Sequence, residues 1–254
     1  MRSTPMDIIE IAGLKHCYPD GRTSLQRIDL TIARGSFVVL AGANGAGKST
    51  LLKHCNGLLT PSEGTVSVGG VPVRQDPLHA RRTVGMVFQD ADSQIVGETV
   101  YDDAAFGPEN LNWPAARIKA SVERALHLVG LSEMYHRSPH LLSGGEKRRL
   151  AIAGVLAMEP EVIVLDEPFA NLDYDGVRQI LAHIVALHGG GTTIVVCVHD
   201  LEKVLAHAGR LIIMREGRIV ADGPPESVVL EAESHGVRIP AAVRLGGTVE
   251  SWLR

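Results

Sequence analysis

The stretch from Gly42 to Thr50 limits what this chain can fold into more than any other. It reads Gly-Ala-Asn-Gly-Ala-Gly-Lys-Ser-Thr and fits the G-x-x-x-x-G-K-[ST] phosphate loop at every fixed position. The apolar residues 37–41 before it predict a buried strand, and residues 51–54 after it continue as a helix. Glycines let the backbone curl so that successive N–H groups face one phosphate chain. A structural glycine-rich turn is the weaker alternative, because Lys-Ser follows and both flanks are correct.

The loop residues have distinct expected roles toward a nucleotide and its metal. Lys48 would reach the β and γ phosphates, and the Ser49 hydroxyl would ligate Mg²⁺. The following helix presents its positive N-terminal end to the anion. The loop residues predicted to bind ATP are Gly42, Asn44, Gly45, Ala46, Gly47, Lys48, Ser49 and Thr50.

A second stretch, Leu142-Ser143-Gly144-Gly145-Glu146, precedes a helical run. Ser143 and Glu146 have the spacing of a capping box, but that explanation gives no reason for the two glycines. Gly144 and Gly145 would leave a bare helix N-terminus that a phosphate can approach. The stretch resembles the signature sequence of ABC ATPases. The resemblance implies a dimer, in which Ser143, Gly144, Gly145 and Glu146 touch the γ-phosphate of an ATP bound to a second ATPase domain.

Two adjacent carboxylates follow an apolar run at residues 162–165, which has the composition of a central parallel strand. A carboxylate at the end of such a strand can hold Mg²⁺, and Asp166 fits that role. Glu167 would be the general base that polarises the attacking water. The two groups can differ in role if the metal keeps one ionised while the other faces the water.

Four further residues gain roles from the resemblance to ABC ATPases. It implies that Gln89 contacts Mg²⁺ and the attacking water, and that His199 contacts the γ-phosphate and holds Glu167 and water in line. It also implies that Asp173 organises the dimer interface and that Tyr18 stacks on adenine. From the residues alone, Gln89 is a strand-end amide and Tyr18 an ordinary aromatic beside the Pro-Asp-Gly turn, and these alternatives stay open.

The segment from Gln89 to Ala116 contains no Lys or Arg but carries several acidic residues. A solvated acidic face is the plain interpretation, and a docking surface for a basic helix of a membrane subunit, between Gln89 and Asn110, is the sharper one. Residues 88–94, 105–111 and 18–21 resemble ATPases of energy-coupling-factor (ECF) transporters, which import vitamins or cobalt and nickel ions. Ala91 departs from the usual proline there and leaves the loop less rigid.

Charge and cysteine usage restrict the partners. The net charge of −4 disfavours nucleic acid, and three scattered cysteines suit a reduced cytosol. The N-terminus has no signal region, and no apolar run approaches the roughly 18 residues that span a bilayer. We therefore expect a peripheral protein at the cytoplasmic face of the cell membrane.

The resemblance covers nearly the whole chain and implies an α/β fold. We expect a P-loop NTPase (RecA-like) core with a mainly parallel sheet, an antiparallel β subdomain and an α-helical subdomain. Alternating residues at 8–32 predict short flanking strands, and residues 64–73 predict a hairpin. The ATPase domain would span 1–225 with the helical arm at about 90–158. Residues 226–254 would form a short tail with one helix near 227–233.

The leading functional hypothesis is an ATP-hydrolysing subunit of an ABC importer whose motifs resemble the ECF type. It would work in a homodimer or related heterodimer with membrane subunits. Its cofactors would be ATP and Mg²⁺. The alternative is a soluble ABC ATPase that acts on nucleic acid or ribosomes, although the segment between the phosphate loop and the signature stretch has no sustained heptads of a coiled-coil insertion. A kinase on the same core gives no account of Ser143 or His199.

Overall fold

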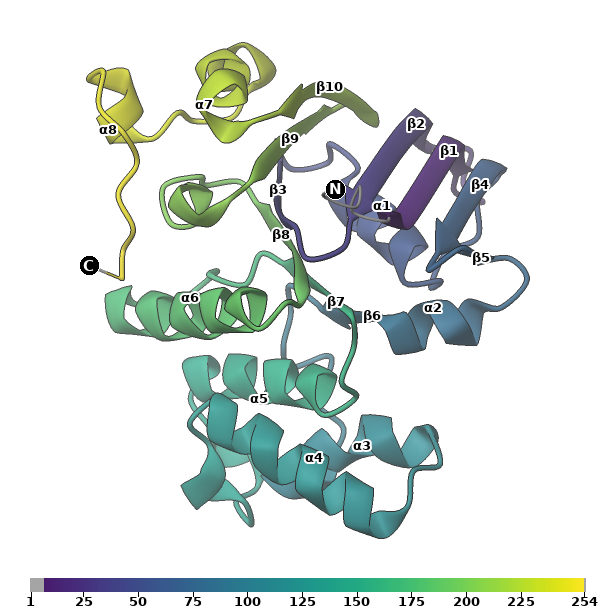
Figure 1. Ribbon diagram of the computed structural model, residues 1–254, viewed down its shortest axis with the longest axis vertical. Helices are drawn as coiled ribbons and strands as arrows, with labels where there is room; N and C mark the ends of the chain where they lie inside the picture. The colour runs from purple at the N-terminus through teal and green to yellow at the C-terminus, as the bar shows by residue number, and fades with distance from the viewer. Residues whose placement is uncertain (1–6, 254) are drawn as a thin grey trace, which may run out of the picture.

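A six-stranded sheet forms the centre of the computed structural model, which describes residues 7–253 (Figure 1). Its strand order is β10-β9-β3-β8-β7-β6. The bounds are β3 (Phe37–Ala41), β6 (Val84–Val87), β7 (Val162–Asp166), β8 (Thr193–Val198), β9 (Arg210–Arg215) and β10 (Arg218–Gly223). All neighbours from β9 to β6 are parallel, and β10 is an antiparallel edge strand. The predicted mainly parallel sheet is confirmed, with β3, β7 and β8 buried along their whole length.

A second, antiparallel sheet lies to one side and has the order β2-β1-β4-β5. It consists of β1 (Asp7–Cys17), β2 (Thr23–Ala33), β4 (Glu63–Val68) and β5 (Val71–Pro72). The expectation of short strands at 8–32 is wrong, because β1 and β2 each run for 11 residues. Their pairing passes through several register irregularities, which interrupt the polar–apolar alternation without ending the strands. The predicted hairpin is confirmed by the pairing of β4 with β5.

One helix packs against both sheets. Helix α1 (Lys48–Cys55) buries Leu51 and Leu52 in a hydrophobic cluster with residues of both sheets, such as Ile9 and Leu40. The short helix α2 (Pro77–Thr83) follows β5 and leads into β6. Burial of these side chains fixes the start of α1 relative to the end of β3, which is where the phosphate loop lies.

The helical arm consists of α3 (Val100–Asn110), α4 (Ala115–Leu128) and α5 (Gly144–Leu156), with short 3-10 turns at Ser132–Met134 and Pro139–Leu141. It lies beneath the central sheet in Figure 1. The arm leaves the sheet after β6 and returns before β7, and these two strands are direct parallel neighbours. The arm is therefore an insertion between adjacent strands of one sheet.

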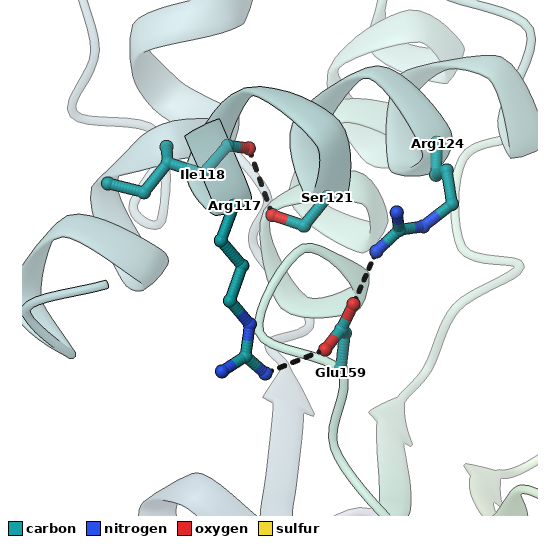
Figure 2. A network of polar contacts seen from close by, with 5 residues as sticks. All are labelled: Arg117, Ile118, Ser121, Arg124 and Glu159. Atoms are coloured by element: carbon teal, nitrogen blue, oxygen red, sulfur yellow. Dashed lines mark hydrogen bonds and ion pairs between the residues drawn. The ribbon is translucent and has the colours of Figure 1, made fainter. Parts of the chain in front are cut away.

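A charged network ties the arm to its point of return (Figure 2). Glu159 follows α5 with a left-handed backbone, φ 52°. Its carboxylate accepts hydrogen bonds from Arg117, at 3.0 Å, and from Arg124, both on α4. These arginine contacts hold the pKa of Glu159 below its usual range. One carboxylate thus fixes the position of α4 against the connection between α5 and β7.

The last third of the chain holds α6 (Tyr174–Gly189), a 3-10 turn at Leu205–His207, α7 (Pro225–Val228), a 3-10 helix at Val229–His235 and α8 (Ala241–Arg244). The single tail helix expected near 227–233 is instead α7 with the 3-10 helix, and α8 was not predicted. The tail buries Val228, Val229, Ala232, Val237 and Ile239 in the same cluster as the central sheet. The boundary at residue 225 stays a prediction, since residues on both sides share one core.

Candidate functional site: the nucleotide pocket and the signature surface

The phosphate loop joins β3 to α1 and depends on glycine at defined positions. Gly45 and Gly47 have φ of 82° and 100°, which side chains rarely adopt. A Cβ on Gly42 would lie 2.3 Å from the Met214 carbonyl oxygen, and one on Gly47 would lie 2.8 Å from the Ser24 carbonyl oxygen. The loop backbone therefore sits directly against β9 and β2, where no side chain fits.

Lys48 is buried at the start of α1. Its ammonium donates hydrogen bonds to the carbonyl oxygens of Gly42, at 2.7 Å, and Ala43, at 3.1 Å. Gly47 is the N-cap of α1, and no side chain caps this end of the helix. The first N–H groups of a helix have no partner within it, so this N-terminus offers free donors to an anion.

An open pocket of about 430 Å³ lies over the phosphate loop. Strand ends and loops from both sheets converge there. It brings together these predicted site residues: Tyr18, Asn44, Gly45, Ala46, Gly47, Lys48, Ser49, Thr50, Gln89, Asp166, Glu167 and His199. Gly42, the first residue of the loop, does not line the pocket. We call this set the nucleotide pocket.

The two carboxylates enter the pocket from the end of β7. Asp166 is 5% exposed and Glu167 is 8% exposed. Glu167 has a left-handed backbone, φ 52°, and its N–H donates to the Cys197 carbonyl oxygen on β8 at 2.9 Å. His199, just beyond β8, places Nδ1 2.9 Å from Glu167 Oε1. The strained backbone and the histidine together aim a nearly buried carboxylate into the pocket.

Sequence reasoning missed part of the pocket wall near Tyr18. The Tyr18 hydroxyl lies 3.0 Å from Thr50 Oγ1, which also accepts from Ser24 at 2.9 Å. The Arg22 guanidinium stands 5.1 Å from the centre of the Tyr18 ring. Arg22, Thr23 and Ser24 line the pocket as well, and their place just after the Pro-Asp-Gly turn was the available signal. Stacking of Tyr18 on adenine stays a prediction.

The signature stretch forms a separate pocket of about 410 Å³. Its walls include Ser143, Gly144, Gly145 and Glu146 at the start of α5, and Asp173 at the start of α6. The capping box is present: Ser143 N donates to Glu146 Oε2 at 2.7 Å, and Glu146 N donates to Ser143 Oγ at 3.3 Å. The Ser143 N–H lowers the pKa of Glu146. We call this set the signature surface.

Neither packing nor backbone conformation within this chain requires glycine at positions 144 and 145 of the signature surface. A Cβ on Gly144 would meet nothing within 4 Å, and one on Gly145 would meet only the Leu172 side chain at 3.7 Å. Neither glycine is among the residues with positive φ. Their small size therefore leaves open space over the helix N-terminus, where something outside this chain can approach the backbone.

Comparisons with known proteins agree with this geometry. The ABC transporter family profile matches residues 25–170. The energy-coupling factor transporter ATP-binding protein EcfA of Methanocaldococcus jannaschii is 42% identical over 246 residues, which cover 94% of this chain and 88% of the relative. This chain belongs to the ATP-binding proteins of ABC transporters.

Other relatives narrow the position of this ABC ATPase within the family. The cobalt import ATP-binding protein CbiO of Rhodobacter capsulatus is 41% identical over 244 residues, 94% of this chain and 87% of the relative. The solved structure of CbiO1 from Clostridium perfringens, part of the ABC transporter complex CbiONQ, superposes with a TM-score of 0.81 at 36% identity, over 94% of this chain and 98% of that one. The predicted fold class and the resemblance to ECF-type ATPases are confirmed. This ABC ATPase is an ATP-binding subunit of the ECF type, and ATP is the nucleotide it binds.

Proposed function

We propose that this ABC ATPase hydrolyses MgATP in a pair of ATPase chains and thereby powers an ECF-type importer. The observation that carries the proposal is the separation of the expected ATP contacts into two pockets of one chain. The nucleotide pocket holds Lys48, Glu167 and His199, whereas Gly144 and Asp173 belong to the signature surface. A second ATPase chain, the same or related, would bring its signature surface over the nucleotide pocket and complete the site.

Hydrolysis would depend on the pair of Glu167 and His199. Glu167, 11% exposed at its side chain, would accept a proton from water that attacks the γ-phosphate. With Nδ1 facing Glu167, the other ring nitrogen of His199 is directed away from that contact and can serve the phosphate. Lys48 and the loop N–H groups would stabilise charge on the phosphate oxygens. Positioning of water and charge therefore does most of the catalytic work.

The residues suit magnesium held partly by the nucleotide. Ser49, Gln89 and Asp166 line the same pocket and offer hydroxyl, amide and carboxylate oxygens, which are ligands that Mg²⁺ prefers. Within residues 7–253, no group of three or more His, Cys, Asp or Glu side chains is arranged to hold a metal. Phosphate and water oxygens would therefore complete the coordination. When bound, Mg²⁺ would neutralise phosphate charge.

A groove of about 620 Å³ between the core and the helical arm would receive the membrane subunit. Large apolar side chains stand exposed along it: Leu58, Leu78, Val96 and Phe106 are 43%, 57%, 59% and 52% exposed. Buried Asp103 shapes one wall, because its Oδ1 accepts from the N–H groups of Val96, at 2.7 Å, and Gly97, at 3.0 Å. Part of the acidic segment between Gln89 and Asn110 forms one side of this groove, and Arg81 and Arg82 lie on the core side. Its exposed apolar side chains fit the apolar face of an amphipathic helix, whose basic residues would lie toward the acidic segment.

Contacts from α5 would connect this groove to both nucleotide surfaces. Arg148, 5% exposed, donates to the Phe88 carbonyl oxygen at 2.9 Å, directly before Gln89. Lys147 forms an ion pair with Asp92. Helix α5 begins at the signature surface. A shift of the segment from Phe88 to Asp92 would therefore be accompanied by a shift of the signature surface. Closure of the pair on ATP would in this way reach the membrane subunit.

The proposed place of the chain is the cytoplasmic face of the cell membrane. Among the described residues, no helix has the length and apolarity needed to cross a bilayer. Attachment would therefore run through the groove and the partner subunits. The relatives of this chain are named as transporter ATP-binding proteins, which does not favour the alternative of action on nucleic acid or ribosomes.

The proposal is tested by purifying the full-length chain from membranes of its own cells in mild detergent and identifying what comes with it. An integral membrane subunit with basic cytoplasmic helices, together with a compact substrate-binding membrane protein, is expected. Recovery with two large permeases and an external binding protein would contradict the ECF assignment. Recovery with nucleic acid and no membrane protein would contradict the transport function.

A further inference from the structure

The ring of His199 has little support of its own. Strand β8 ends at Val198, and the His199 side chain is 63% exposed, with its Nδ1 on Glu167. The direction of the ring therefore depends on the backbone that follows β8. Whatever fixes residues 200–204 also fixes the histidine.

The C-terminal tail covers that following segment. Asp200 forms an isolated parallel bridge with Arg238. Val237 and Ile239, on either side of Arg238, are 2% and 9% exposed, so the tail is anchored in the core at this point. The N–H of Ala241, the first residue of α8, donates to Glu202 Oε2 at 3.0 Å.

The far end of the tail is anchored at a second place. After α8 the chain runs back along the molecule to α6 (Figure 1). Ser251 Oγ lies 3.0 Å from His207 Nε2, and the Trp252 ring lies 5.3 Å from the Tyr174 ring, centre to centre. The tail thus spans the segment behind His199 and is fixed at both ends.

We propose that the tail is a positioning element for ATP hydrolysis and that Glu202 is a positioning residue that acts through His199. This inference rests on the part of His199 in the proposed function. The Glu202 carboxylate holds α8 against the segment that follows β8, and the backbone bridge between Asp200 and Arg238 joins the same segment to the tail. Leu201 and Val204, both 0% exposed, anchor the inner side of this segment in the core, so the tail contacts hold its outer side. Without the Glu202 bond, that outer side would gain freedom, and the alignment of His199 with Glu167 would weaken.

The test measures steady-state ATP turnover of the full-length protein. Glu202→Ala is expected to lower kcat about tenfold, in line with the cost of small displacements at a reacting centre. The KM for ATP is expected to stay within about twofold of wild type, because the phosphate loop does not contact Glu202. Glu202→Gln keeps an oxygen acceptor for the Ala241 N–H and is expected to restore kcat. Glu231→Ala, at an exposed tail carboxylate, is the matched control.

A second pair of variants covers the case in which Glu202→Ala folds poorly. Trp252→Ala is expected to lower kcat in the same way, and Trp252→Phe, which keeps an aromatic ring on Tyr174, is expected to retain it. Each variant is measured at a temperature well below its own midpoint of unfolding. A loss of thermal stability with unchanged kcat would mean a merely structural role and would overturn the proposal.

Two reference proteins separate this inference from the proposed function. If wild type shows no ATP hydrolysis, or His199→Ala turns over as wild type does, the proposed function fails. If His199→Ala is impaired while Glu202→Ala and Trp252→Ala keep full kcat, only the positioning role fails. Equal losses in Glu202→Ala and Glu202→Gln would also overturn it.

Discussion

His199 Nδ1 lies 2.9 Å from Glu167 Oε1, and the two side chains differ sharply in exposure. The histidine side chain is 63% exposed, while the glutamate side chain is 11% exposed. The imidazole therefore covers the pocket side of a carboxylate that is otherwise enclosed by protein. The proposed proton acceptor, Glu167, and the group proposed to align it, His199, can therefore be removed one at a time.

Glu167→Gln is expected to abolish most ATP hydrolysis and leave ATP binding intact. The amide keeps the size of the carboxylate but cannot accept the proton of the attacking water, and a positioned general base contributes about 10²–10⁴-fold. With hydrolysis blocked, the closed dimer should accumulate in the presence of MgATP. Phosphate release and size-exclusion chromatography measure the two effects. Turnover equal to wild type would refute the role of Glu167.

His199→Ala is expected to lower kcat about 10²–10³-fold, as loss of one preorganised donor does in other enzymes. ATP binding, measured by equilibrium titration, should change little, since Lys48 and the loop are untouched. His127→Ala, at an exposed position of α4 outside the nucleotide pocket, serves as the control and should hydrolyse ATP normally. A weakened ATP affinity with unchanged kcat would assign His199 to binding.

Phe106→Ser is expected to weaken association with the membrane subunit while basal ATP hydrolysis of the free chain stays normal. The Phe106 side chain is 52% exposed in the groove, so its removal deletes apolar contact area that only a partner would cover. Leu230→Ser, at a 66% exposed position on the tail, is the matched control. Co-purification from membranes gives the readout. Equal recovery of the membrane subunit with both variants would exclude the groove as the docking site.

Glu159→Gln is expected to lower the midpoint of thermal unfolding at neutral pH by about 1–8 °C. Two exposed ion pairs are lost, each with about 0.2–1 kcal/mol, and about 2–4 °C corresponds to 1 kcal/mol at this chain length. Arg117 and Arg124 lower the folded pKa of Glu159, so its stabilisation is present above the unfolded value of about 4.3. It is lost as the pH falls through the folded pKa.

Thermal melts of wild type and Glu159→Gln from pH 7 to pH 3 would check this sign. The difference between the two proteins should shrink as the pH falls. Glu123→Gln, which removes one pair with Lys119 at 3.9 Å, should have a smaller effect at neutral pH. A difference that grows toward acid pH would show that Glu159 is not stabilised as a carboxylate.

Local motifs made much of the nucleotide pocket predictable. The loop from Gly42 to Thr50 carries its own backbone requirements, and Asp166 and His199 follow apolar runs that can only be central strands. Parallel strands end at one edge of a sheet, so residues at those ends meet in space. The fold class was predictable for the same reason, because alternating strands and helices allow few arrangements.

Contacts between distant segments had no local signal. Trp252 lies in a tail whose apolar residues follow no clear period, and nothing near it indicates that it packs on Tyr174. Helix α8 has four residues, too few for a periodic pattern to be visible. Strands β1 and β2 continue through register irregularities that mask their alternation. In each case the partner segment, and not the local sequence, decides the structure.

The division of contacts between the nucleotide pocket and the signature surface has a consequence for inheritance. A chain with a defective phosphate loop still carries an intact signature surface, and a chain with a bulky residue at Gly144 still carries an intact loop. If the proposed pair consists of two copies of this chain, a mixed pair of these variants would have both defects in one composite site, and its other site would have only intact parts. Two individually inactive alleles would then complement each other within one dimer.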